Sequence, residues 1–476
     1  MIMNKTITID PVTRIEGHAK VFINLTDDGQ LESAGLVVNE LRGFEKILTG
    51  MDADRMPLIT ARICGVCPTA HHLAASNALD NAAGVTAPPA AVLLRELMYM
   101  GHLIHSHCLS LFVLQGPDLV LGLDADPAIR NVVGVVQAVP EIAKKALRCR
   151  SIGQKINEIV GGRGTHPVTS VAGGIAFVLD SDNERQLREL TDEALTLSLE
   201  LMPVVKQLLM KQIEKHPAML SDWVVPAWSV GTVQPDGTID MLNGEIRAVD
   251  KEGNKILQFP TRDYDQHLSE SVLDWSYMKQ VAVLHENERH DYRVGPLARF
   301  NATERYGTPE ADREREEFIR TIGRPCHANV MQSYTRLIEL VYFAERARKI
   351  LSMPEIHGET RVPVKFPGGR GVGHVEAARG TLIHDYEIDE NGIVRAANLI
   401  VATQQNYALI NKTVAQAAIS HVINRPDDQA LLNAVEFGIR CYDPCLSCAT
   451  HALGTMPMEV AVTRGGSLVQ TIRRLC

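Results

Sequence analysis

The chain has few of the features that mark nucleic-acid-binding, repeat or low-complexity proteins. Its 476 residues carry a formal net charge of −9, and lysine and arginine are not gathered into runs. This charge pattern excludes an extended surface for nucleic acid. Internal repeats and low-complexity tracts are absent as well. With 45% hydrophobic residues, the chain is long enough to bury the large core of a soluble enzyme.

Nucleotide-binding loops and targeting segments are also missing from the sequence. No Gly-x-Gly-x-x-Gly follows a predicted strand and no Walker loop is present, so we do not expect flavin or NAD(P) on this chain. The first residues show neither the basic nor the apolar region of a signal peptide. The most apolar stretch, 97–116, contains three histidines and is expected to be a buried helix, with no membrane span. These absences favour a cytoplasmic location.

The nine cysteines do not form a disulfide pattern. Their number is odd and their spacing irregular, which favours a reducing compartment with metal-bound or buried free thiols. Cys108, Cys149 and Cys326 are expected to be small buried residues, because free cysteine is commonly buried. The role of Cys441 stays open at this point.

Two Cys-x-x-Cys pairs, one near each end of the chain, carry the strongest signal. Cys64 and Cys67 form the first pair, Cys445 and Cys448 the second, and a histidine follows each closely. Two intervening residues let both thiolates of a pair face one soft metal, so joining the pairs supplies four sulfur ligands. Zinc, an iron–sulfur cluster and a nickel–iron centre all fit this ligand set. The pairs of a structural zinc ribbon lie far closer in sequence, so this spacing favours an enzyme domain between them.

Hydrophobic periodicity predicts an α+β fold, mainly α, with a long-helix bundle core and small antiparallel β-sheets near the N-terminus, in the middle and near the C-terminus. Strands are expected over 5–10, 18–24 and 32–39, and helices over about 68–83, 88–115, 128–159 and 183–215. Residues about 222–262 are predicted to be β-rich, helices to return near 268–280 and 309–351, and a hairpin to join 385–388 to 393–402. Pro68 suits a first helical position, which places Cys67 at the N-cap, where the helix dipole favours a thiolate.

Short segments around the two pairs resemble the large, catalytic subunit of nickel–iron hydrogenases along nearly the whole chain. Arg62 precedes the first pair and Asp443-Pro444 the second. The other segments that carry the resemblance are Thr13-Arg14-Ile15-Glu16-Gly17-His18, Arg42-Gly43-Phe44-Glu45, Gly161-Gly162-Arg163 with His166-Pro167, Val294-Gly295-Pro296-Leu297-Ala298-Arg299 and Glu376-Ala377-Ala378-Arg379-Gly380. The resemblance implies reversible heterolytic cleavage of H2 into protons and electrons. It also implies a catalytic domain over 1–451, made of an N-terminal β region (about 1–50), a helical core (about 68–215), a β insertion (about 222–262) and a helical and β C-terminal half (about 268–451).

The same resemblance implies how the four cysteines share their metals. Cys64 and Cys445 would bind nickel terminally, and Cys67 and Cys448 would bridge nickel to iron. The family's iron also carries cyanide and carbon monoxide. A zinc site that serves folding or partner binding is the alternative for the thiolates, but it leaves the other motif segments unexplained.

Five residues are implied to take part in catalysis. Cys445 would be the first proton acceptor, and Glu16 would relay the proton away from the centre. Arg379 would stand over the open coordination site, with its guanidinium fixed by Asp118 and Asp443. The family's common pattern has proline directly before this arginine, where this chain has alanine, so the local rigidity is expected to differ.

Further residues are implied around the centre. His71 would orient a cysteine through a hydrogen bond, Thr403 would donate a hydrogen bond to iron-bound cyanide, and Arg62 would border the site without binding metal. Glu45 and His451 match positions that share a magnesium or iron(II) ion with a backbone carbonyl.

The tail 452–476 is expected to be removed on maturation. In the family, a dedicated nickel-sensing protease cuts after the final motif histidine, here between His451 and Ala452. Alternation from Met458 to Thr463, followed by two glycines, predicts a β-hairpin in this tail. A member of the family that matures without the cut is the alternative.

Electrons have to leave the site, and this chain has no relay of its own. The resemblance implies a small hydrogenase subunit with an iron–sulfur cluster as partner. The segments around the cysteines are most similar to the cytoplasmic, NAD(P)-linked bidirectional or soluble hydrogenases, which adds diaphorase subunits that bind flavin and NAD(P). A non-catalytic subunit of a respiratory complex shares this architecture and is a second alternative, although such a subunit should lack the four cysteines.

Overall fold

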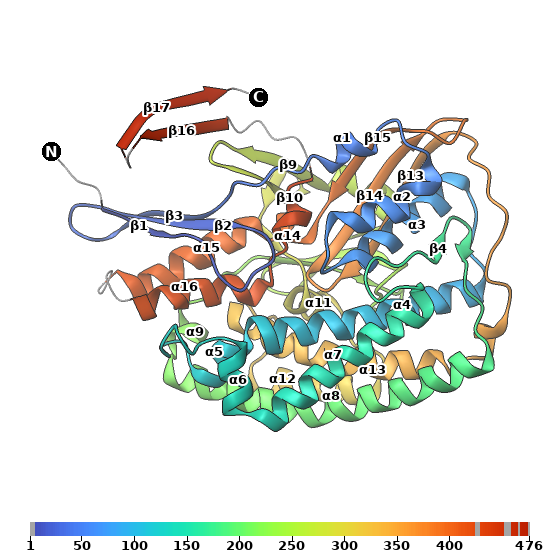
Figure 1. Cartoon of the computed structure of the whole chain (residues 1–476), viewed down its shortest axis with the longest axis horizontal. Coiled ribbons are helices and arrows are strands. Elements are labelled where there is room, and N and C mark those ends of the chain that lie inside the picture. The colour runs from blue at the N-terminus through green and yellow to red at the C-terminus, as the bar shows by residue number, and fades with distance from the viewer. Residues whose placement is uncertain (1–4, 424–428, 452–457, 465–466, 475–476) are drawn as a thin grey trace.

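Small antiparallel sheets lie above a layer of long helices in the computed structural model (Figure 1), which describes residues 5–423, 429–451, 458–464 and 467–474. This is the mainly helical α+β arrangement that the sequence predicts. The N-terminal sheet has the order β1-β2-β3, with β1 (Lys5–Ile9), β2 (Ala19–Leu25) and β3 (Leu31–Val38). Every second residue of β2 is buried, which is the period of a strand with one face on the core.

A bundle of long helices forms the core of the molecule. Its members are α3 (Pro68–Ala83), α4 (Pro89–Cys108), the π-helix η3 (Leu109–Leu114), α6 (Val132–Ala138), α7 (Pro140–Gly161), α8 (Ser181–Lys215) and α13 (Gln332–Ile350). The helices expected over 68–83, 88–115, 128–159 and 183–215 are confirmed, with a break before Pro140. α4 and α7 approach closely because glycines face each other: a Cβ on Gly153 would lie 2.5 Å from the backbone oxygen of Gly101.

One apolar helical segment, Pro89–Leu114, is long and apolar enough to cross a membrane, alone among the described helices. However, 72% of its most apolar window is buried inside the protein, and its helix α4 packs against α7 and α13. The segment is therefore the centre of the helical bundle, as the sequence analysis expects.

Three further sheets follow along the chain. The first, in the order β12-β6-β7-β8, contains β6 (Trp228–Val233), β7 (Glu245–Val249), β8 (Lys255–Phe259) and β12 (Tyr292–Arg293). It is mixed, because β12 pairs with β6 in parallel. The second consists of β9 (Leu268–Leu273), β10 (Ser276–His285) and β11 (Glu288–His290), and the third of β13 (Gly369–Ala377), β14 (Gly380–Ile388) and β15 (Val394–Ile400). The β-rich stretch expected over 222–262 and the hairpin expected after residue 385 are confirmed.

The helix expected over 268–280 is wrong, because this stretch forms the antiparallel hairpin of β9 and β10. Buried residues in β10 recur at every second position, as at Ser276 and Met278 and again at Val281 and Val283. Valine, tyrosine and tryptophan in this stretch suit a pleated surface packed on one side.

Shorter elements connect the sheets and the bundle. They are α1 (Phe44–Leu48), η1 (Ala53–Arg55), α2 (Met56–Thr60), η2 (Ala61–Ile63), α5 (Gly116–Leu121), β4 (Ser170–Val171), β5 (Gly174–Ile175), α9 (Ala218–Ser221), η4 (Thr261–Asp263), α10 (Tyr264–His267), α11 (Pro296–Ala302), α12 (Pro309–Thr321), η5 (Asn329–Met331), η6 (Pro354–His357), α14 (Ala402–Gln405), α15 (Tyr407–Ala417), η7 (Ala418–Val422), α16 (Gln429–Tyr442) and α17 (Leu446–Ala449).

The tail forms the hairpin that its alternation predicts. β16 (Met458–Arg464) pairs antiparallel with β17 (Ser467–Arg474), and the two strands are drawn at the upper left of Figure 1. Ala452, on the far side of the expected cleavage point, lies outside the described residues.

Candidate metal centre

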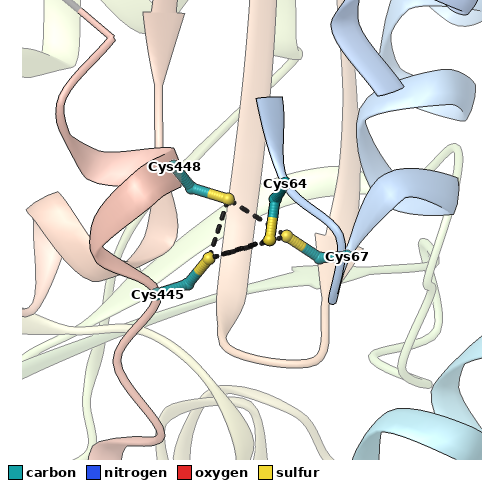
Figure 2. Close-up of side chains that lie close together, drawn as sticks. All are labelled: Cys64, Cys67, Cys445 and Cys448. Atoms are coloured by element: carbon teal, nitrogen blue, oxygen red, sulfur yellow. Dashed lines mark hydrogen bonds between the residues drawn. The ribbon is translucent and has the colours of Figure 1, made fainter. Parts of the chain in front are cut away.

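The two cysteine pairs meet where α3 and α17 begin (Figure 2). Cys67 is the N-cap of α3, with Pro68 as the first helical residue, as the sequence predicts. Cys445 is the N-cap of α17, and Cys64 directly follows η2. The Sγ atoms are 3.1 Å apart for Cys67 and Cys448, 3.3 Å for Cys64 and Cys445, and 2.9 Å for Cys445 and Cys448. All four sulfurs lie within 4.8 Å of one another, so folding gathers them around one point.

The cluster is enclosed by protein, and its donor set fits soft metal ions. The exposed fractions are 2% for Cys64, 5% for Cys67, and 1% for Cys445 and Cys448. Four thiolates at this spacing repel one another strongly in an enclosed site, so full deprotonation requires a cation that binds sulfur. Hydrogen bonds from the other three sulfurs hold the pKa of Cys64 well below its ordinary value. Burial raises the pKa of Cys445 and Cys448 well above it.

The pKa of Cys67, the N-cap residue of α3, is shifted in the opposite direction from that of Cys64. Hydrogen bonds from Cys445 and Cys448 by themselves lower the pKa of Cys67. The hydrogen bond and charge of Cys64, together with burial, outweigh them, so the pKa of Cys67 lies above its ordinary value. A negative charge in an enclosed cluster disfavours a second one beside it.

Glu16 lies against the second cysteine pair. It forms a parallel β-bridge with Cys445. Its backbone oxygen accepts from the N–H of Leu446 at 3.1 Å, and its Oε2 accepts from the N–H of Ser447 at 3.0 Å. Gly17 permits this approach, because its φ is 82° and a Cβ there would lie 2.7 Å from the Cβ of Leu446. Glu16 is partly exposed, so it is a solvent-accessible carboxylate next to enclosed sulfurs.

Arg379 and Asp443 form a buried ion pair beside the cluster. Nε of Arg379 donates to the backbone oxygen of Asp443 at 2.6 Å, and Nη2 donates to Oδ1 at 3.0 Å. Burial lowers the pKa of Arg379, but the charges of Asp443 and of the nearby cysteines raise it well above its ordinary value. The third nitrogen, Nη1, is buried and makes no hydrogen bond within the described part of the chain. The site therefore holds a fixed cation with one free donor.

Glu45 and His451 meet in a second polar group. Nδ1 of His451 is 2.8 Å from Oε1 of Glu45, which also accepts from the N–H of Leu399 at 2.8 Å. On the other side of the ring, Nε2 of His451 is 2.8 Å from Oε1 of Gln404. Burial by itself raises the pKa of Glu45, but the hydrogen bond and charge of His451 bring it below its ordinary value.

Comparison with known proteins identifies the family. A family model described as nickel-dependent hydrogenase matches residues 42–132 and 257–451, which is more than half of the chain and includes all four cysteines. A second model, described as HoxL-like, matches residues 6–41, the segment with Glu16. The chain belongs to the nickel-dependent hydrogenase family.

Relatives of this hydrogenase chain match it over nearly its whole length. A vhu subunit of the F420-non-reducing hydrogenase of Methanococcus voltae is 42% identical over 87% of this chain and 98% of its own. The NAD-reducing hydrogenase HoxS subunit beta of Cupriavidus necator is 39% identical over 97% of each chain. A crystal structure of an NAD+-reducing NiFe hydrogenase in the H2-reduced state is 36% identical with a TM-score of 0.90, and the match covers 95% of this chain and 100% of that one. The Ni-Fe-Se hydrogenase of D. vulgaris Hildenborough shares the fold, at 23% identity and a TM-score of 0.76.

The chain is thus the catalytic subunit of a nickel–iron hydrogenase, and its four enclosed cysteines fit a nickel–iron centre. The two alternatives that the sequence leaves open are set aside. A zinc-binding protein does not explain the family match, and a non-catalytic respiratory subunit should lack the cysteine cluster.

The expectation that Asp118 fixes Arg379 is wrong. Asp118 of the hydrogenase chain is fully buried and accepts two hydrogen bonds from Arg14, at 2.8 and 2.7 Å, and two from Arg440, at 3.0 and 3.4 Å. Arg440 also donates to the backbone oxygen of Thr13 at 3.0 Å. Asp118 therefore anchors the segment that carries Glu16 to α16, and only Asp443 pairs with Arg379 among the described carboxylates.

The turn that carries Arg379 is held from another helix. Ala377 pairs with Gly380 in the β13–β14 hairpin, so Ala378 and Arg379 form its two-residue loop. Arg299 of α11 is fully buried and donates to the backbone oxygen of Ala377 at 2.8 Å and to that of Ala378 at 3.5 Å. These bonds constrain the loop at the point where the family's proline is missing.

Arg299 in turn depends on two buried carboxylates, and Glu339→Gln is expected to destabilise the protein. Arg299 donates to both oxygens of Glu339 at 2.7 Å and to Glu376 at 2.9 Å. Breaking a buried ion pair costs about 3–5 kcal/mol, and here Arg299 loses the carboxylate bonded to its Nε and Nη2 and keeps only Glu376. Equilibrium unfolding in urea measures the loss. Glu317→Gln, which breaks the partly exposed pair with Lys206, is the control and should cost less than about 1 kcal/mol. Equal effects of the two substitutions would contradict the buried network.

The remaining predicted residues lie around the centre at different distances. Oγ1 of Thr403 accepts from the N–H of Cys445 at 2.9 Å, which leaves its hydroxyl proton available. Nε2 of His71 lies 3.3 Å from Sγ of Cys448. Arg62 is exposed to solvent.

Some residues of the site escaped the sequence reasoning. Arg440 stands out as a charged residue in the apolar run Phe437-Gly438-Ile439-Arg440-Cys441-Tyr442, and a buried charge requires a partner. Gln404 directly follows Thr403, and His384 lies four residues after Gly380 on the same strand. No signal in the sequence indicates which partners these side chains choose.

Proposed function

We propose that this hydrogenase chain cleaves H2 reversibly in a complex that passes the electrons to NAD(P). One observation carries the proposal: four enclosed sulfurs lie within 4.8 Å of one another, with Glu16 bonded to Ser447 and Arg379 bonded to Asp443 on the segment of the second cysteine pair. The similarity to the NAD-reducing HoxS subunit beta, along nearly the whole of both chains, supports NAD(P) as the electron acceptor. The sequence identity to a subunit of an F420-non-reducing hydrogenase is about as high, so an electron acceptor other than NAD(P) is the second candidate.

Four cysteines would hold the metals. Cys64 and Cys445 would bind nickel terminally, and Cys67 and Cys448 would bridge it to an iron that carries cyanide and carbon monoxide. When bound, the centre supplies a redox-active Lewis acid that polarises H2. The chain contributes an enclosed pocket, sulfur donors on two helix starts and a fixed charge environment.

Proton transfer would run from Cys445 to Glu16. The β-bridge between these two residues places the carboxylate next to the second cysteine pair, and its partial exposure gives the proton a way out. The amide of Ser447 orients the carboxylate through its Oε2. A thiolate base with a carboxylate relay is a usual arrangement for general acid–base chemistry.

Arg379 would polarise a small ligand at the open coordination site. Its pairing with Asp443 holds the guanidinium still, and its Nη1 has a free donor. Thr403 would donate its hydroxyl proton to iron-bound cyanide while its oxygen accepts from Cys445. His71 would orient Cys448, and Arg62 would border the site.

The electron acceptor and the partner subunits can be tested in one experiment. We propose a small subunit with an iron–sulfur cluster, together with diaphorase subunits that bind flavin and NAD(P), as partners in the cytoplasm. The complex, purified with its partners under anaerobic conditions, should contain stoichiometric nickel, show infrared bands of iron-bound diatomic ligands and reduce NAD or NADP with H2. Zinc in place of nickel, without such bands, would overturn the metal assignment, whereas reduction of dyes but of neither nucleotide would overturn the acceptor alone.

Glu45 and His451 would share a divalent ion, Mg2+ or Fe2+, with a backbone carbonyl. Glu45→Gln is expected to lose this ion, because a neutral amide binds a hard cation far more weakly than a carboxylate does. Elemental analysis of the purified complex after gel filtration measures the loss. Glu40→Gln replaces a partly exposed carboxylate nearby in the sequence; it is the matched control and should retain the ion. Unchanged magnesium and iron in Glu45→Gln would remove Glu45 from the ligand set.

The catalytic domain would end at His451, with 452–476 removed by a maturation protease between His451 and Ala452. The hairpin β16–β17 follows this point, so the cut would release it as one unit. Intact-mass measurement on active, nickel-loaded protein should give a mass that ends at His451. A full-length mass with full activity would show that this protein matures without the cut.

A further inference from the structure

A chain of hydrogen-bonded side chains leads from Cys448 into the neighbouring sheet. Nε2 of His71 lies 3.3 Å from Sγ of Cys448, and Nδ1 of His71 lies 3.0 Å from Nε2 of His384. Nδ1 of His384 is in turn 2.6 Å from the hydroxyl oxygen of Tyr386. His71 belongs to α3 and the other two to β14, and these elements pack directly on each other.

The strand geometry brings the two β14 residues onto one face. His384 and Tyr386 are two positions apart, so both side chains point towards α3. Asp385 between them points the other way and bonds to Arg370 and Tyr264. All three rings of the chain are buried, and neither imidazole has a carboxylate among its hydrogen-bond partners in the described structure.

A metal-bound thiolate fixes which atom donates in each hydrogen bond of this series. A thiolate has no proton and can only accept, so the proton of the His71 ring has to be on Nε2. In a neutral ring Nδ1 then accepts, which requires the proton of His384 on Nε2. Nδ1 of His384 accepts in its turn, and the hydroxyl of Tyr386 supplies that proton. Each contact of the hydrogen-bonded series then has one donor and one acceptor.

We propose that His384 and Tyr386 are positioning residues that hold His71 in the tautomer that donates to Cys448. This inference rests on the proposed role of Cys448 as a bridging thiolate. Hydrogen-bond donors around a metal ligand tune the electron density that reaches the metal. Bonds in a buried chain also strengthen one another, so the far end of the chain affects the thiolate. These hydrogen-bonded side chains therefore set how strongly Cys448 donates electrons to the iron.

Two substitutions at His384 separate the donor from the mere presence of a side chain. His384→Leu removes the partner of His71 Nδ1, whereas His384→Gln keeps an amide N–H near the position of Nε2. In the holoenzyme complex, His384→Leu should shift the infrared band of iron-bound carbon monoxide to lower wavenumber, because a thiolate that receives a weaker hydrogen bond donates more electron density. His384→Gln should restore the band most of the way to the wild-type position.

Two further variants complete the test. Tyr386→Phe should shift the band in the same direction by a smaller amount, since only the terminal donor is lost. His374→Leu is the matched control. His374 is a buried histidine of the adjacent strand β13 that bonds to Thr261 and takes no part in the hydrogen-bonded series. The carbon monoxide band of His374→Leu should stay at the wild-type position.

The outcomes are distinguishable. An unshifted band in His384→Leu, or equal shifts in His384→Leu and His384→Gln, would overturn the positioning role while leaving the nickel–iron centre in place. Absence of carbon monoxide bands from the wild-type complex would overturn the proposed function, and with it the inference that rests on it.

Discussion

Cys445→Ser is expected to abolish hydrogen-dependent dye reduction and to remove nickel from the purified protein. A hydroxyl is a hard and weakly acidic donor, so it does not replace a thiolate on a soft nickel ion. Cys64→Ser should have the same effect, because its sulfur lies 3.3 Å from that of Cys445 and points to the same centre. Nickel analysis and the rate of dye reduction under H2 measure the two losses.

The fold itself is expected to survive these substitutions. Both cysteines lie in a core of several helices and sheets, and the exchange of one sulfur for one oxygen removes only a small part of its volume. Cys326→Ser is the matched control: this thiol is buried like the others but belongs to no metal cluster among the described residues. It should retain nickel and activity. Normal dye reduction by Cys445→Ser would contradict the assignment of the centre.

Glu16→Gln is expected to slow H/D exchange with D2 by about 10²–10⁴-fold, the usual contribution of a positioned acid or base. The amide oxygen can still accept from the N–H of Ser447, so the geometry should persist. The amide cannot carry the proton onwards. Nickel content and the infrared bands of the centre should remain at the wild-type level.

A partly exposed carboxylate of the same region, Glu40, distinguishes proton relay from a general charge effect. Glu40→Gln removes a partner of His18 on the surface and should leave the exchange rate unchanged. Wild-type exchange in Glu16→Gln would show that another group carries the proton from Cys445.

Local features of this hydrogenase chain could be predicted from its sequence. The helix start at Cys67-Pro68, the alternating strands near both ends and the hairpin before residue 394 all follow from short-range rules. Spacing and the soft chemistry of thiolates were enough to pair the cysteines across the chain. Glu45 and His451 were joined by resemblance, and the structure places them in hydrogen-bond contact.

The choice of partners was decided only by the tertiary structure. Asp118 bonds to Arg14 and Arg440 and not to Arg379, because α5 and α16 enclose it on the side of the Glu16 segment. A buried charge pairs with whichever opposite charge shares its enclosure, and sequence distance does not limit that choice. In the same way, β9 and β10 formed strands because packing overrides a weak helical pattern.

By itself, then, the sequence determined which four cysteines form the cluster and most of the secondary structure, since both depend on residue type and local spacing. The three-dimensional structure decided which buried groups support them: Arg299 beneath the Arg379 turn, and His384 with Tyr386 behind His71. These contacts join segments that are far apart in the chain, and they depend on the direction of each side chain after packing. The direction of a side chain on a strand or helix follows from its position, but the residue it meets follows only from the way the elements pack.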